Sequence, residues 1–192
     1  KFSIQNFLNL GKAVIARGKS AIPGVQLDIN LQQPKSVGSI KLSSPNPFDK
    51  PIIDPNYLSD QRDIEDFTKA FRHLRYITEQ DAFKDVLSSE ISPGANVKTD
   101  DDIHSAIRNL TTTGHHPVST CRMGSDNDKG AVLDNKFKVR GTQNLRVVDA
   151  SAFPDQINGN INAAVIMMGE KAADIILDIP PLKREDPRET TI

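Results

Sequence analysis

The stretch NLRVVDASAFPDQINGNINAAVIMMGEKAADIIL, residues 144–177, decides the fold of the last third of the chain. It opens with the short apolar run Leu145–Asp149, which predicts a strand that ends at an acid. The later run Ile161–Leu177 is long, apolar and rich in Ala, Ile and Met, so it predicts a buried helix. A strand, a loop rich in Asn and Gly, and a buried helix are the parts of one α/β unit.

An alternating pattern nearer the start predicts antiparallel strands. Apolar and polar residues alternate over Val25–Leu31, which predicts a strand with one buried face. Ser39–Ser43 repeats the alternation, and we expect the two segments to pair as antiparallel neighbours. Residues 43–57 hold four of the twelve prolines and therefore predict an extended loop or a sheet edge.

Helical periodicity marks three more segments. Residues 4–15 predict a short amphipathic helix, and a longer helix with early acids and later arginines follows the prolines. Another helix should begin at Thr99, because Thr99-x-x-Asp102 is a capping box. The inward-facing residues of the last two predicted helices are Ile64, Phe67, Phe71 and Leu74, and Ile103, Ile107 and Leu110. The charged segment 180–192 predicts a disordered tail.

The composition excludes several classes of protein. The 192 residues carry 24 Lys and Arg against 25 Asp and Glu, so no basic excess favours nucleic-acid binding. The single cysteine, Cys121, excludes an intrachain disulfide and a multi-cysteine metal site. No apolar run reaches the ~18 residues of a membrane span, and no signal peptide is recognisable. We expect a cytoplasmic protein, with peripheral membrane association as the alternative, and the missing initiator Met predicts a fragment or a processed chain.

Two polar segments are candidates for chemistry. His115 and His116 lie together in the loop TTTGHHPVSTCRMG, residues 111–124, where a surface or capping role is the simplest interpretation. The loop has too few ligands for a metal site, and the sequence contains no G-x-S-x-G nucleophile elbow. Within the loop we expect Arg122 to form anchoring hydrogen bonds and Cys121 to pack as a small residue.

Asp149 and the asparagines near residue 160 each allow two interpretations. At the end of the predicted strand, Asp149 lies where α/β sheets bind ligands, or it caps a turn through Ser151. Asn158, Asn160 and Asn162 either cap the last helix or leave its first N–H groups free for an anion or a carbonyl oxygen. Residue types alone attach no reaction to these segments.

Several motifs in order carry a family signature. HPVSTCRMG (116–124) precedes AVLDNKFKVRG (131–141), NLRVVDASAFP (144–154) and NGNINAAVIMMGEKAADII (158–176). With LQQPKSVGSIKLSS and PIIDPNYLSD upstream, the chain resembles the C-terminal region of the glucose–methanol–choline (GMC) flavoprotein oxidoreductases from about residue 18 to 178. It is most similar to their choline dehydrogenase and primary-alcohol dehydrogenase branch.

The resemblance implies an FAD-dependent enzyme that oxidises a primary alcohol. His116 would be the base that takes the hydroxyl proton, flavin N5 would accept the hydride, and Asn160 would contact the alcohol oxygen. The implied cofactor-binding residues are Asp149 and Ala150 near the ribityl and phosphate part of FAD, and Asn160, Ile161 and Asn162 near the pyrimidine end of the flavin. No metal is implied.

The resemblance also divides the chain. We expect an entry helix (1–17), part of an α+β substrate-binding domain with an antiparallel sheet and flanking helices (18–125), the C-terminal strand and helix of an α/β, Rossmann-like FAD-binding domain (126–179), and the tail. The family's G-x-G-x-x-G fingerprint is not in the sequence, so an N-terminal FAD-binding half is an expected partner, on another chain or in a longer form. A cyanohydrin lyase of the same family and a non-catalytic remnant without flavin are the alternatives.

Overall fold

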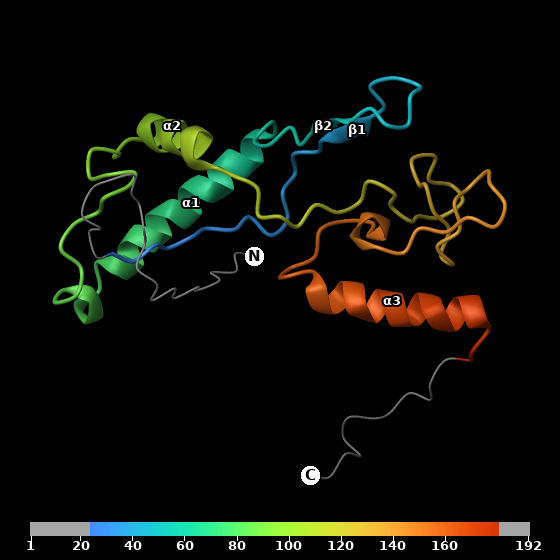
Figure 1. Cartoon of the computed structure of the whole chain (residues 1–192). Coiled ribbons are helices and arrows are strands. Elements are labelled where there is room, and N and C mark those ends of the chain that lie inside the picture. The colour runs from blue at the N-terminus through green and yellow to red at the C-terminus, as the bar shows by residue number, and fades with distance from the viewer. Residues whose placement is uncertain (1–23, 181–192) are drawn as a thin grey trace, which may run out of the picture. The chain divides into compact units, whose positions relative to one another are not determined.

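A computed structural model describes residues 24–180, which form two compact units that divide between Gly114 and His115 along the chain (Figure 1). The helix predicted over 4–15 and nearly all of the predicted tail lie outside the described residues. The functional division expected at residue 125 stays a prediction. None of the helices in residues 24–180 combines the length and the apolar character that a bilayer crossing requires.

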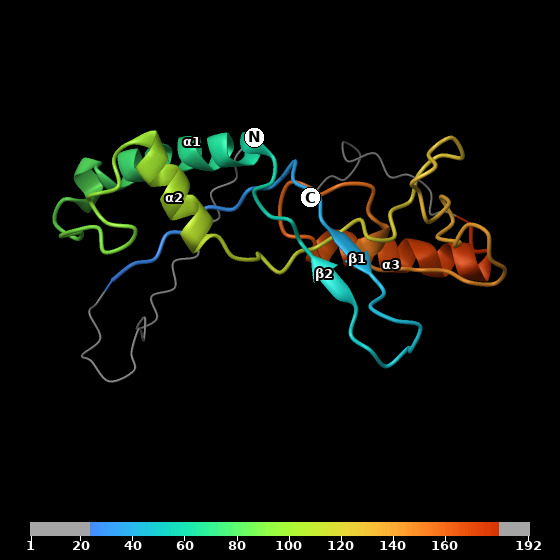
Figure 2. The same cartoon turned by 90° about the horizontal axis from the view of Figure 1, so that it is seen from above.

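Two helices form the core of the first unit. Helix α1 (Gln61–Thr78) packs against α2 (Asp100–Leu110), with Ile64 and Ile103 almost completely buried (Figures 1 and 2). The predicted capping box is confirmed, because Thr99 accepts from the Asp102 N–H while the Asp102 carboxylate accepts from the Thr99 N–H. The predicted stripe on α2 ends one turn early, since Leu110 is half-exposed at the last position of the helix.

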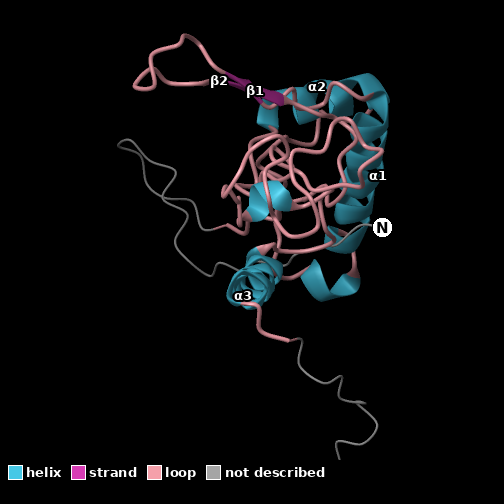
Figure 3. Cartoon of the chain, turned by 90° about the vertical axis from the view of Figure 1, so that its right-hand side faces the viewer, coloured by secondary structure: helices cyan, strands magenta, loops and turns pink. Residues whose placement is uncertain are grey.

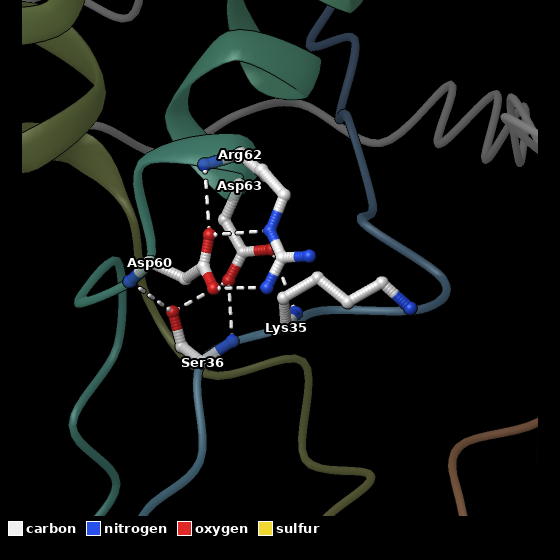
Figure 4. Close-up of polar contacts among 5 residues, drawn as sticks. All are labelled: Lys35, Ser36, Asp60, Arg62 and Asp63. Carbon is white, nitrogen blue, oxygen red and sulfur yellow. Dashed lines mark hydrogen bonds and ion pairs between the residues drawn. The ribbon is translucent and has the colours of Figure 1, made fainter.

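A buried carboxylate fixes the start of α1. Asp63, only 2% exposed, accepts hydrogen bonds from the N–H groups of Lys35 (2.7 Å) and Ser36 (2.8 Å) and from the Ser36 hydroxyl (2.5 Å) (Figure 4). The Ser36 hydroxyl also accepts from the N–H of Asp60, the N-cap of α1. Arg62 hydrogen-bonds the Asp60 carboxylate and lowers its pKa to about 2. The segment around Ser36 is therefore joined to the start of α1 through one buried carboxylate and partly buried polar groups.

The sheet of the first unit is a two-stranded antiparallel ribbon. Strand β1 (Ser39–Lys41) pairs with β2 (Ile52–Asp54), with Ile40 opposite Ile53, and every residue of both strands is exposed (Figure 2). Gly38 lets β1 begin close to the end of β2, because a Cβ there would lie 2.7 Å from the carbonyl carbon and oxygen of Pro55.

The prediction that Val25–Leu31 is a strand paired with 39–43 is wrong. In the described chain this segment has no ladder, and Asn30 alone within it occupies a bridge position. Residues 39–41 pair instead with 52–54, inside the proline-bearing stretch expected to be a loop or an edge. Alternation indicates which face of a segment can be buried, but it carries no information on which distant segment supplies the hydrogen bonds.

The second unit consists mostly of loops and one long helix, α3 (Asn162–Leu177), which Figure 3 shows nearly end-on. Its core brings together residues from the loops and the helix. The buried members are Leu133, Phe137, Ala152, Phe153, Ile161, Met168 and Ala172. Cys121 packs against this core, as expected of a small apolar side chain.

The predicted strand Leu145–Asp149 is wrong as a regular element. The segment is extended and forms one isolated antiparallel bridge, between Arg146 and Lys138, with flanking backbone hydrogen bonds of 3.0 and 3.1 Å to residues 137–139. A short apolar run becomes a ladder only where neighbouring strands continue beside it, and within residues 24–180 this segment has one bridge partner, Lys138.

Helix α3 confirms the predicted helix but is not buried on all sides. Met168 and Ala172 face the core, whereas the apolar side chains of Ile166, Met167 and Leu177 are each more than half exposed. One face of the helix packs on the loops of the second unit. Within the described chain, the apolar side chains on the opposite face are uncovered.

Candidate active site

The loop that carries the two histidines, residues 115–124, is anchored by an ion pair. Arg122 donates through both terminal guanidinium nitrogens to the carboxylate of Asp128, one of them at 2.9 Å. The Gly130 N–H donates to the same carboxylate at 3.0 Å. The Arg122 hydrogen bond, followed by that of Gly130, lowers the pKa of Asp128, and Asp128 in turn raises the pKa of Arg122. The expectation that Arg122 anchors the loop is confirmed.

Backbone hydrogen bonds tie the same loop to a short 3-10 helix, the η2 turn (Ala150–Ala152). Alternate N–H groups of the loop donate to the three consecutive carbonyl groups of the turn: Ser119 to Ala150 (3.4 Å), Cys121 to Ser151 (2.9 Å) and Met123 to Ala152 (3.0 Å). The course of the histidine loop therefore depends on the form of the η2 turn.

Asp149 is the N-cap of the η2 turn. Its Oδ1 accepts from the Ser151 N–H at 2.7 Å and also from the Ser151 hydroxyl. Of the two interpretations that the sequence allowed for Asp149, the structure shows the cap. Its contact with a cofactor, and that of the neighbouring Ala150, stay predictions.

Helix α3 begins without a side-chain cap. Its N-cap residue, Ile161, is buried and has no side chain that could accept a hydrogen bond. The exposed amides of Asn160 and Asn162 flank it, and Gly159, at φ +127°, turns the chain into the helix. Neutral amide groups and the positive end of the helix dipole are thus gathered at one place.

The structure brings together the two residues predicted to be catalytic. The Nε2 atom of His116 lies 3.0 Å from Oδ1 of Asn160, although the residues are 44 positions apart in the sequence. Both side chains are exposed in the chain. Because an amide oxygen only accepts, this arrangement has Nε2 as the donor, and rotation of the Asn160 amide would reverse the roles.

Ser119 is a residue of this loop that sequence reasoning missed. Its backbone has φ +71°, a left-handed conformation unusual for a residue with a Cβ, and within residues 24–180 its buried Oγ has no hydrogen-bond partner. No sequence signal predicts this, because a serine in a polar loop is ordinary.

Within residues 24–180, no cluster of three or more His, Cys, Asp or Glu side chains could hold a metal ion. The chemistry available at the site comes from an imidazole, amides and backbone N–H groups.

Comparisons with known proteins identify relatives of this chain. The GMC oxidoreductase family model matches residues 34–169. Oxygen-dependent choline dehydrogenase of Vibrio vulnificus is 45% identical over 159 residues, which cover 83% of this chain and 28% of the relative. Mitochondrial choline dehydrogenase of Mus musculus is 44% identical over 158 residues, 82% of this chain and 26% of the relative. The crystal structure of a formate oxidase matches with a TM-score of 0.73 at 33% identity, over 78% of this chain and 26% of that one.

The matched region contains the whole site. Residues 34–169 include the histidine loop, the η2 turn with its cap Asp149, and the start of α3. The chain spans about a quarter of the length of the curated relatives it matches. Because the family model covers most of the chain and several solved relatives share its fold, the chain belongs to the GMC oxidoreductase family.

Proposed function

We propose that this chain is the C-terminal, catalytic-residue-bearing part of an FAD-dependent enzyme that oxidises a primary alcohol. The observation that carries the proposal is the 3.0 Å contact between His116 Nε2 and Asn160 Oδ1. It joins a base and a hydrogen-bonding amide from two separate family motifs, in a chain that belongs to an oxidoreductase family.

The donor groups at the start of α3 suit FAD. The pyrimidine end of a flavin presents carbonyl oxygens, and the residues proposed to meet it supply two amide side chains and helix N–H groups without a side-chain cap. Those residues are Asn160, Ile161 and Asn162. Asp149 already accepts two bonds from Ser151, so the backbone around Ala150 is the group we expect to serve the ribityl and phosphate part. When bound, FAD supplies the hydride acceptor, N5.

The chain's own residues orient the alcohol and remove its proton. An alcohol oxygen that contacts both His116 and Asn160 would replace the hydrogen bond that the two side chains now share. The Asn160 amide would donate to that oxygen and hold it in one orientation. With the Asn160 amide rotated so that its NH₂ group faces the histidine, Nε2 of the neutral imidazole would accept the hydroxyl proton while Nδ1 carries the ring hydrogen.

The relatives indicate which alcohol to test first, and an N-terminal half of the protein is the partner that we propose. Choline is the first alcohol to test, because both curated relatives described above are choline dehydrogenases. We propose that the remaining FAD contacts come from an N-terminal FAD-binding half. We further propose that residues 18–125 contribute to the substrate-binding domain and residues 126–179 to the FAD-binding domain.

Stopped-flow reduction of the flavin by choline, in the FAD-loaded enzyme that contains this chain, tests the proposal. His116→Ala should slow reduction by ~10²–10⁴-fold with bound FAD unchanged, because the proton acceptor is lost. Asn160→Ala should slow it less, because the base remains. His115→Ala is the matched control and should have little effect.

Three results would contradict the proposal. The first is an equal loss in His115→Ala and His116→Ala. The second is a flavin that choline and other primary alcohols leave oxidised, which would favour the cyanohydrin lyase. The third is a protein that binds no FAD, which would favour the non-catalytic remnant.

A further inference from the structure

The part of the histidine loop that follows His116 is fastened to the protein by several hydrogen bonds. The N–H groups of Ser119, Cys121 and Met123 donate to the η2 turn, and Arg122 is paired with Asp128. These contacts begin three residues after His116. The direction in which the His116 side chain leaves the loop therefore depends on the η2 turn.

The η2 turn depends on Asp149 for its own form. It is a single 3-10 turn of three residues, too short to be stable by itself. Asp149 Oδ1 holds the Ser151 N–H at 2.7 Å and the Ser151 hydroxyl, and Ala152 is completely buried at the other end. The Asp149 carboxylate, the buried Ala152 and the turn's own backbone bonds (Ala152 N–H to the Asp149 carbonyl at 3.0 Å and Phe153 N–H to the Ala150 carbonyl at 3.3 Å) together hold the three carbonyl groups that receive the loop.

The conformation of Ser119 indicates that the loop is constrained. Its φ of +71° and its buried, unpartnered hydroxyl are both unfavourable, and within the described chain no bond of its side chain offsets them. Such a conformation persists only where the surroundings fix it. Here the surroundings include the bond from the Ser119 N–H to the Ala150 carbonyl, at the first residue of the η2 turn.

We propose that Asp149 is a positioning residue for His116. Its carboxylate holds the η2 turn, the turn holds the histidine loop, and the loop places Nε2 of His116 against Asn160. The inference rests on the proposed function, since it concerns how the proposed base is aligned. It gives Asp149 a role through the protein rather than through contact with FAD.

A double-mutant cycle separates these two roles. In the FAD-loaded enzyme, Asp149→Ala should slow flavin reduction at saturating choline by ~10–10²-fold, as expected for a misplaced base, with the FAD content unchanged. In a His116→Ala background, Asp149→Ala should cause no further loss, because the group it aligns is already gone. Asp149→Asn keeps an acceptor oxygen for Ser151 and should restore most of the rate.

Hydrogen exchange gives a readout that does not depend on activity. Asp149→Ala should speed exchange of the Cys121 and Met123 amides, whose acceptors are on the η2 turn. Asp155→Ala is the matched control, because it removes an exposed carboxylate whose bond is local, to the Gln156 N–H. It should leave both the exchange and the rate unchanged.

The outcomes against the inference are distinct from those against the proposed function. Losses that multiply in the double mutant, or a loss of bound FAD in Asp149→Ala that Asp149→Asn shares, would overturn the positioning role while leaving His116 as the base. A His116→Ala enzyme as fast as wild type would overturn the proposed function itself. If Asp149→Ala does not fold, Ser151→Ala removes one of the two donors and should give a smaller loss of the same non-additive kind.

Discussion

At the scale of single residues, the site combines well-satisfied polar groups with one strained residue. Arg122 and Asp128 are paired through two hydrogen bonds, and Asp149 takes both donors of Ser151. Ser119, three residues before Arg122, has a left-handed backbone and a buried hydroxyl without a hydrogen-bond partner in residues 24–180. A substitution at Ser119 that removes the backbone strain or the unpartnered hydroxyl should therefore raise the free energy of unfolding.

Replacement of Ser119 by glycine should raise the free energy of unfolding by about 1 kcal/mol. Glycine adopts φ +71° without a Cβ clash, and it removes a buried hydroxyl that has no partner in the described chain. Ser119→Ala removes the hydroxyl but keeps the Cβ, so it should gain less. Denaturant unfolding of the two variants measures the difference, and a glycine variant less stable than the alanine variant would contradict the argument.

The residues of the site were predictable to different degrees. Resemblance singled out His116 and Asn160, and the structure places them in contact. The sequence allowed two interpretations of Asp149, because a carboxylate before Ser151 can cap a turn or meet a ligand. The conformation of Ser119 was not predictable, since positive φ in a serine arises from its surroundings and has no local sequence signal.

At the scale of elements, the helices followed their local signals closely. The stripe and the charge order predicted α1, and the capping box marked the start of α2. Both signals act within one or two turns, so neighbouring residues suffice to form them. A strand forms only where another segment supplies its hydrogen bonds, and local sequence does not identify that segment. The pairing predicted for Val25–Leu31 is therefore wrong, and residues 52–54 form β2 instead.

Replacement of Thr99 by alanine should lower the free energy of unfolding by about 1 kcal/mol. Thr99 satisfies the Asp102 N–H at the start of α2, and its loss leaves that donor without its cap. Thr112→Ala, in the exposed loop after the same helix, is a suitable control and should change the stability by less than about 0.5 kcal/mol. Equal stability of the two variants in thermal unfolding would refute a role for the cap.

At the scale of the whole chain, one type of interaction recurs in both units. Several carboxylates have lowered pKa values because they accept hydrogen bonds from arginines or backbone N–H groups. These are Asp60, Glu90, Asp100, Asp102, Asp128 and Asp134. At Asp134, burial would raise the pKa, but the N–H groups of Lys138 and Lys136 outweigh it. The folded chain therefore holds these groups ionised at a pH where the unfolded chain protonates them.

Stability should fall on acidification and hardly change between pH 5 and pH 7. Each lowered pKa stabilises the fold above the pKa of the unfolded carboxylate, about 4, and this contribution is lost as the pH drops through the folded value. For Asp60 the loss should extend down to about pH 2. Urea midpoints measured from pH 7 to pH 2 follow the effect, and Asp128→Asn should give a shallower decline. A midpoint that stays constant down to pH 3 would contradict this account.

The polar cluster at the start of α1 affects how well the first unit can tolerate insertions and deletions. The segment that contains the ribbon begins and ends at the same partly buried polar cluster, formed by Ser36, Asp60 and Asp63 (Figure 4). The two ends of this segment are thus held together whatever residues connect β1 to β2. Closing a flexible loop becomes only about 0.6 kcal/mol less favourable each time its length doubles. Insertions into residues 42–51 should therefore leave α1 in place, so this excursion can be lengthened, shortened or exchanged without rebuilding the helices that follow it.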